Sequence, residues 1–275
     1  MPEGEWLCFE RWLAQGMHAG MDYMRRHEAL RRDPRLLLEG TRSIVSVAFN
    51  YRQPNPYPRI AVYALGRDYH KVLRKILKRV VAPLRDEYGG GWRICIDSAP
   101  ILERYWAVRS GMAVRSPRSG NVVVPGVGSM VFLAEILTTA EIPESRYNFV
   151  TESAAPASFD FDGETAEKVC PTGALQPGGM VDSRRCINYL TIEHRGPWNE
   201  EQRQLMALPG AKGHVFGCDI CQYACPSNQG KPLPVIPEFQ PLPILKSYIS
   251  AILSGDPTAL SSLDLTGSPL SRKRL

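Results

Sequence analysis

The chain has 275 residues, which is enough for one large domain or two smaller ones with cores of their own. Hydrophobic residues make up 44% of it and the formal net charge is +5, a mildly basic balance that permits an RNA partner without requiring one. No apolar run approaches the roughly 20 residues of a membrane helix, and the N-terminus lacks the pattern of a signal peptide. We therefore expect a cytoplasmic protein without membrane contact.

The first elements are predicted by their apolar patterns. Residues 5–16 and 20–32 are expected to form two short helices. Residues 43–50, SIVSVAFN, have the β-branched and apolar character of a buried strand. A Pro-rich loop follows, and IAVYAL at 60–65 is predicted as a short strand.

Helical spacing is clearest at residues 69–86. Apolar side chains recur there every three or four positions and form one stripe: Val72, Leu73, Ile76, Leu77 and Val80. The opposite side is rich in lysine and arginine. We interpret it as a solvated face, with contact to RNA phosphates as the alternative.

Strands and helices continue to alternate up to residue 145. Strands are predicted at 92–97, 121–124 and 129–136, and a helix is expected to start after Pro100. This alternation predicts an α/β (α+β) domain over residues 1–145.

Composition changes in the second half of the chain. A linker rich in proline, serine, alanine and acidic residues is predicted at 142–165, and a cysteine-rich module at 150–232. Residues 233–275 are expected to form a Pro-rich tail that leads into a truncated helical region. The last residues, SRKRL, resemble the start of a basic helix, so we expect truncation there.

Five of the seven cysteines lie close together in the sequence: Cys170, Cys186, Cys218, Cys221 and Cys225. Clustered cysteines in a cytoplasmic protein are more often metal ligands than disulfides. The run C-x2-C-x3-C-P at 218–226 is the end of the bacterial ferredoxin pattern, in which the cysteine before proline ligates the other cluster. With a second Cys-Pro pair at Cys170, the pattern predicts one [4Fe-4S] cluster on Cys170, Cys186, Cys218 and Cys221. A four-cysteine zinc site is the alternative.

The ligands of a second cluster are missing. Ferredoxin spacing before Cys170 would place cysteines at three positions that hold Asp160, Gly163 and Ala166. Cys225, the ligand expected to cross over to that cluster, then has no partner thiolates. The sequence predicts one complete cluster.

Seven strings in this order, over about residues 18–230, resemble the epoxyqueuosine reductase family: MDYMRRHEALRRDP, YALGRDYHKVLR, DSAPILER, GSMVFLAEIL, CPTGAL, DSRRCINYLTIEHRGP and FGCDICQYACPSN. The resemblance implies an oxidoreductase that reduces epoxyqueuosine to queuosine in a tRNA anticodon loop. It implies base-off cobalamin on the α/β domain, a ferredoxin-like iron–sulfur module after it, and an external electron donor. We expect a monomer.

The resemblance also implies roles for single residues. Asp97 of the DSAP string corresponds to the family's proton donor, and its place after the strand WRICI predicts desolvation and a raised pKa. The alternative is that Asp97 or Ser98 caps the next helix. Residues implied to lie beside the cobalamin are Arg67, Asp68, Tyr69, His70, Cys218 and Asp219; Asp68 is also expected to cap a helix.

The chain departs from the family in three respects: the missing cysteines, SGMAVRSPRSGN in place of a G-W-x-G-K-N-like string, and the absence of a C-terminal helical-repeat region. Three interpretations stay open. The chain is an active one-cluster reductase, a degenerate relative that binds tRNA or cobalamin without turnover, or a fragment of a longer protein. A single-cluster electron carrier is an alternative from another class.

Overall fold

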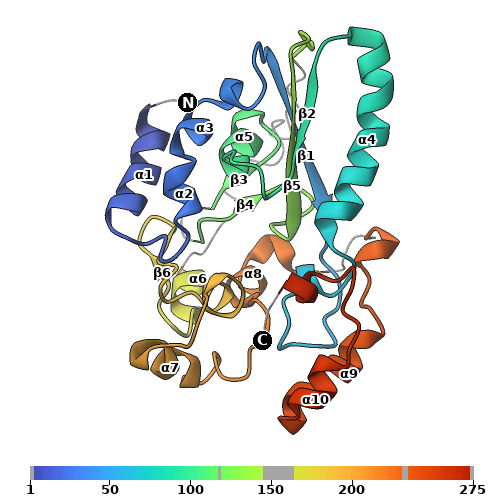
Figure 1. The fold of residues 1–275 in the computed structure, drawn as a ribbon. Coiled ribbons are helices and arrows are strands. Elements are labelled where there is room, and N and C mark those ends of the chain that lie inside the picture. Colours follow the sequence, from blue (N-terminus) through green and yellow to red (C-terminus); the bar gives the residue numbers. More distant parts are fainter. Residues whose placement is uncertain (1–2, 117–118, 145–163, 231–234, 273–275) are drawn as a thin grey trace.

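The structure is a computed structural model that describes residues 3–116, 119–144, 164–230 and 235–272. At its centre lies a three-stranded antiparallel sheet in the order β1-β5-β2 (Figure 1). Its strands are β1 (Ser43–Asn50), β2 (Trp92–Cys95) and β5 (Val131–Thr138). The middle strand, β5, pairs over its whole length with β1, so Ser46 lies opposite Glu135.

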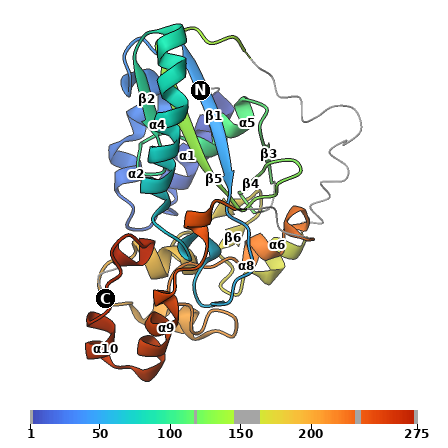
Figure 2. The same cartoon turned by 90° about the vertical axis from the view of Figure 1, so that its right-hand side faces the viewer.

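Helices cover both faces of this sheet (Figures 1 and 2). On one face lies α4 (Tyr69–Tyr88), whose buried stripe of Val72, Leu73, Leu77 and Val81 packs into the main core. On the other face lie α1 (Glu3–Ala14), α2 (Tyr23–Arg26), α3 (Glu28–Arg32) and α5 (Glu103–Arg109). As predicted, Asp68 caps α4, because its carboxylate accepts a hydrogen bond from His70 N.

The remaining elements are short. Two small hairpins join β3 (Val114–Arg115) to β4 (Val122–Val123) and β6 (Leu175–Gln176) to β7 (Met180–Val181). The later helices are α6 (Glu164–Val169), α7 (Glu200–Ala207), α8 (Ile220–Tyr223), α9 (Ile244–Ser254) and α10 (Pro257–Ser261). Tyr189–Glu193 forms one π turn, and 3-10 turns occur at Pro34–Leu36, Val62–Ala64, Pro226–Asn228, Pro237–Phe239 and Pro269–Arg272.

The main hydrophobic core joins both halves of the chain. Side chains of the sheet and of α4 pack there against residues from the second half: Val215, Phe216, Phe239, Leu245, Tyr248 and Leu270. This packing fixes the cysteine-rich module against the sheet. No helix among the described residues is long and apolar enough to cross a membrane.

The predicted elements were confirmed at 43–50 and 69–86, but the strand at 60–65 was wrong. That segment contains a 3-10 turn, Val62–Ala64, and a single bridge from Ile60 to Phe216. Its amides bond to loop partners in place of a neighbouring strand: Ala61 N donates to Phe216 O, and Val62 N donates to the Asp219 carboxylate. Burial against the module therefore outweighs the strand-like composition.

The helix expected after Pro100 starts later, at Glu103, with Leu102 at its N-cap. The alternative in which Asp97 or Ser98 caps it was therefore wrong. The helix expected at 20–32 is divided at His27 into α2 and α3. Most of the predicted linker at 142–165, and the end of the SRKRL segment, lie outside the described residues.

Candidate active site and iron–sulfur site

A cavity of about 440 Å³ lies where the first turn of α4 meets the sheet and the cysteine-rich module. Its lining includes three of the residues singled out by the sequence, Tyr69, His70 and Asp97. Its aromatic wall consists of Tyr51, Tyr63, Phe132 and Phe216. A larger cavity of about 1170 Å³, beside β1, contains none of the predicted site residues in its lining. The smaller cavity is therefore the candidate active site.

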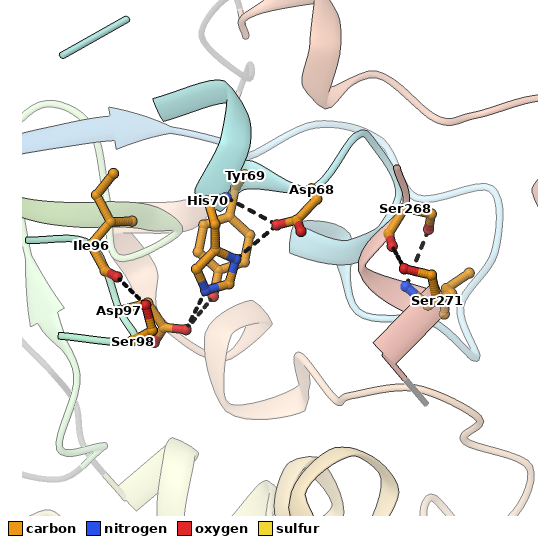
Figure 3. Close-up of polar contacts among 9 residues, drawn as sticks. Asp68, Tyr69, His70, Ile96, Asp97, Ser98, Ser268 and Ser271 are labelled. Atoms are coloured by element: carbon orange, nitrogen blue, oxygen red, sulfur yellow. Dashed lines mark hydrogen bonds and ion pairs between the residues drawn. The ribbon is translucent and has the colours of Figure 1, made fainter. Parts of the chain in front are cut away.

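A hydrogen-bonded chain leads from the Asp97 carboxylate into α4 (Figure 3). Asp97 Oδ2 accepts a hydrogen bond from the Tyr69 hydroxyl at 2.8 Å and lies 2.8 Å from His70 Nε2. The other ring nitrogen, His70 Nδ1, lies 2.8 Å from Asp68 Oδ1. The His70 imidazole thus connects the buried Asp68 carboxylate to the Asp97 carboxylate at the cavity, an arrangement suited to proton transfer.

The environment of Asp97 differs from the one predicted. Its side chain is 56% exposed, so the expected desolvation by the strand WRICI was wrong. Asp97 follows β2 with a positive φ of 47°, which turns its side chain out of the strand. Burial, and then the nearby Asp97 carboxylate, raise the pKa of Tyr69 far above its ordinary value. The Tyr69 hydroxyl therefore stays protonated and donates to Asp97.

Two carboxyl groups behind Asp97 were missed by the sequence reasoning. Glu103 Oε1 accepts a hydrogen bond from Asp97 N at 2.5 Å. Burial, and then the Asp97 carboxylate, raise the pKa of Glu103 to about 8. Glu135, in the middle of β5, is fully buried, and burial followed by Glu103 raises its pKa well above the ordinary value. The one signal in the sequence was an acidic residue inside the apolar run VFLAEILT.

The four cysteines assigned to the predicted cluster interact electrostatically, but no group of three or more His, Cys, Asp or Glu side chains among the described residues is placed so that it could hold a metal ion. Cys170 follows α6, Cys186 precedes the π turn, and Cys218 and Cys221 lie at the start of α8. Burial raises the pKa of Cys218 and of Cys221 to about 12, and the other three thiols of the group each add to the rise at Cys221. A positively charged metal centre bound to these thiols would lower their pKa and so reverse the shift.

Local geometry also suits a cluster at Cys170. Ala174 N donates a hydrogen bond to Cys170 Sγ at 3.3 Å, through the turn formed by CPTGA. Backbone donors to cysteine sulfur tune iron–sulfur clusters. The three positions that should supply thiolates to a second cluster hold Asp160, Gly163 and Ala166. Cys225 is buried after α8, and its backbone N–H donates to Gln222 O.

Three of the other residues predicted to contact the cofactor lie outside the cavity lining: Arg67, Cys218 and Asp219. The Asp219 carboxylate accepts a hydrogen bond from Val62 N at 2.6 Å, and burial raises its pKa to about 6. The Arg67 side chain is exposed, and its backbone N donates to Glu238 O. Among the described residues, the cavity lining includes Tyr69 and His70 but not Arg67, Cys218 or Asp219.

Two family models match the chain. The model for "Epoxyqueuosine reductase QueG, DUF1730" matches residues 31–98, and the "4Fe-4S double cluster binding domain" matches residues 167–228. The second match covers all five clustered cysteines. It shows a 4Fe-4S domain in the chain and favours iron–sulfur over the zinc alternative.

Curated relatives are similar along most of the chain. The epoxyqueuosine reductase of Synechococcus sp. (strain RCC307) is 37% identical over 240 residues, which cover 83% of this chain and 69% of the relative. That of Francisella cf. novicida (strain Fx1) is 34% identical over 84% of this chain. The chain spans 65% of the Francisella protein's length.

Solved structures share the fold. An epoxyqueuosine reductase bound to an epoxyqueuosine-modified tRNA-Tyr stem loop aligns with a TM-score of 0.66 at 25% identity, over 89% of this chain and 63% of that one. A Bacillus subtilis epoxyqueuosine reductase with its catalytic aspartate loop swung out of the active site aligns with a TM-score of 0.56 at 28% identity. That match covers 77% of this chain and 55% of the Bacillus chain.

Proposed function

The chain belongs to the epoxyqueuosine reductase family, and we propose that it reduces epoxyqueuosine to queuosine in tRNA. The observation that carries the proposal is the Asp97 carboxylate at the cavity, bonded to Tyr69 and to the His70–Asp68 pair. Removal of an epoxide oxygen requires that oxygen to be protonated as it leaves, and these groups can supply protons.

The proton balance assigns a role to each residue. Converting an epoxide to an alkene and water consumes two electrons and two protons. Asp97 donates to the departing oxygen, and His70, whose ring reaches Asp97 Oδ2, returns a proton to Asp97 for the second donation. Asp68 holds the imidazole in position through Nδ1. Tyr69 orients the Asp97 carboxylate through its hydroxyl.

Cobalamin is proposed to bind at this cavity, on the domain of residues 1–145. When bound, it supplies the electrons that reduce the epoxide. The volume of about 440 Å³ and the aromatic wall suit part of a large, flat ring system. His70 bonds to Asp68 and Asp97, so it serves the proton path and not the cobalt. Arg67, Cys218 and Asp219 stay proposed contacts, outside the lining.

A single [4Fe-4S] cluster is proposed on Cys170, Cys186, Cys218 and Cys221, within the ferredoxin-like module at 150–232. An external donor would reduce it directly, because the ligands of a second cluster are missing. The tRNA-bound relative supports a tRNA anticodon loop as the substrate of this chain. We propose that residues 97–102 correspond to the catalytic loop that is swung out of the active site in the Bacillus subtilis protein.

The test is an anaerobic assay with cobalamin, a chemical reductant and tRNA that carries epoxyqueuosine, read by mass spectrometry of the nucleosides. The wild-type chain should form queuosine. Asp97→Asn should form none while it keeps cobalamin binding and the cluster spectrum. The matched control is Asp86→Asn, an exposed carboxylate near the other end of α4, which should retain full activity. Equal turnover by Asp97→Asn would refute the proton-donor role.

The missing cysteines favour one other candidate, a relative that binds tRNA without turnover. It predicts tRNA binding that weakens steeply with salt. Absence of queuosine from a wild-type chain loaded with cluster and cobalamin would support this alternative over the reductase.

A further inference from the structure

The loop that carries Asp97 is held from behind by Glu103. The Glu103 carboxyl, at the first residue of α5, accepts the Asp97 N–H at 2.5 Å and so closes the turn between β2 and α5. The Asp97 side chain is held separately, by Tyr69 and His70 of α4. Asp97 is thus fixed between two helices on opposite faces of the sheet.

The main-chain contact matters because the conformation of Asp97 is unfavourable by itself. Only two non-glycine residues in the described part of the chain have a positive φ, and Asp97 is one of them. Residues in this region persist only when their surroundings hold them there. A hydrogen bond from the strained residue's own N–H to Glu103 supplies such a restraint.

The groups around Glu103 decide its charge. Titratable side chains face its carboxyl from every neighbouring element: Asp97 in the loop, Tyr69 and His70 on α4, Arg104 on α5, Arg31 on α3, Cys95 on β2 and Glu135 on β5. Burial, and then the Asp97 carboxylate, raise the pKa of Glu103 to about 8, against the lowering effect of Arg104 and His70, which favours the protonated carboxyl at neutral pH. A protonated carboxyl still accepts a hydrogen bond through its carbonyl oxygen.

We propose that Glu103 is a positioning residue that acts as an uncharged acceptor, holding the main chain of Asp97 so that its carboxyl meets Tyr69 and His70. The inference rests on the proposed role of Asp97 as proton donor. An uncharged residue in this place has a clear advantage. It holds the loop without burying a charged carboxylate, which would cost free energy.

Two variants separate the parts of the proposal. Glu103→Gln keeps an uncharged carbonyl acceptor, whereas Glu103→Leu has similar size and none. The matched control is Glu200→Leu, because Glu200 also starts a helix, α7, but within the described part of the chain its side chain bonds to Arg203 and Gln204 of that helix. The cluster spectrum and cobalamin uptake report folding. If Glu103→Leu loses them, Glu103→Ala, a better helix former, replaces it.

The first readout is hydrogen exchange at the Asp97 amide in the cluster-loaded chain without substrate. It does not depend on turnover, so it tests the positioning role even if the chain reduces nothing. Glu103→Leu should exchange about tenfold faster than wild type. Glu103→Gln and Glu200→Leu should stay within about threefold. Unchanged exchange in Glu103→Leu would overturn the proposal.

The second readout is steady-state kinetics. Glu103→Leu should lower kcat by about tenfold or more with KM within about twofold, since a misplaced proton donor affects the reacting state more than binding. Glu103→Gln should restore kcat to within about threefold of wild type. If Glu103→Gln fails as badly as Glu103→Leu while its Asp97 amide stays protected, the acid itself is required and the uncharged-acceptor assignment is wrong.

Discussion

Glu135 offers a strong test of how burial controls charge in this fold. Its side chain is 0% exposed at the centre of β5, and neither carboxyl oxygen has a hydrogen-bond partner among the described residues. Its cross-strand neighbours are uncharged: Ser46 on β1 and Cys95 on β2, whose thiol pKa burial raises to about 11. We predict that Glu135→Met stabilises the protein, and increasingly so as the pH rises.

The magnitude follows from two terms. An unpartnered buried neutral carboxyl costs about 1–3 kcal/mol, which methionine of similar shape removes. The second term depends on pH, because burial raises the pKa of Glu135 well above 4.5. The folded state then holds the proton to higher pH than the unfolded chain. This effect leaves the free energy of unfolding of the wild-type protein unchanged below about pH 4.5. At higher pH it lowers that free energy by up to about 1.4 kcal/mol per pH unit, until the pKa of Glu135 in the folded state is passed.

The variant should therefore be more stable than wild type by about 1–3 kcal/mol at pH 5, and the difference should increase between pH 5 and 7. A difference of about 3 kcal/mol corresponds to a rise of on the order of 10 °C in the unfolding midpoint. The assay is anaerobic thermal unfolding of the cluster-loaded chain at pH 5, 6 and 7, followed by circular dichroism. Infrared spectra at pH 7 should show a carboxylic-acid C=O band that the variant lacks.

Glu135→Gln is the matched control, because it cannot ionise but still buries an unpartnered polar group. It should remove the pH dependence and keep the pH-independent cost. Parallel pH curves for wild type and Glu135→Met, with no carboxylic-acid band lost, would show that Glu135 is ionised or paired. The reasoning from burial would then be refuted.

Three further predictions concern the cluster and the YALGRDYH segment. Cys221→Ser should abolish the visible absorbance of the cluster, whereas Cys225→Ser should leave it in place; loss in both would give Cys225 a ligand role. Anaerobic metal analysis should find about four irons and four sulfides per chain, and about eight irons would contradict the single-cluster assignment. Gly66→Ala should destabilise the chain by a few kcal/mol in denaturant unfolding, because its Cβ would lie 2.4 Å from Phe239 Cα; an unchanged midpoint would contradict this packing.

Local patterns in the sequence determined several elements correctly. The helical stripe at 69–86 and the β-branched run at 43–50 became α4 and β1, because each carries a complete buried face within one short segment. Cysteine spacing predicted a cluster, and the family match supports a 4Fe-4S domain at 167–228. The motif strings also predicted the family, since each holds enough residues in fixed order to exclude chance.

Tertiary contacts decided what those patterns could not. The strand-like IAVYAL became a 3-10 turn because its amides bond to Phe216 and Asp219, more than 150 residues away in the chain. The same kind of contact explains why Asp97 is exposed although it follows an apolar strand. Its positive φ and its bonds to α4 turn the side chain toward the cavity.

The carboxyl groups of Glu103 and Glu135 show most clearly what tertiary contacts decided. In the sequence, Glu103 is an ordinary first-turn helix residue and Glu135 a single acid in a strand. Only the packing of α5 onto the sheet brings Glu103 to Asp97 and within electrostatic reach of the buried Glu135. Charge in a protein depends on what surrounds a group in space, so the sequence could single out Asp97 while the fold alone determined how it is held.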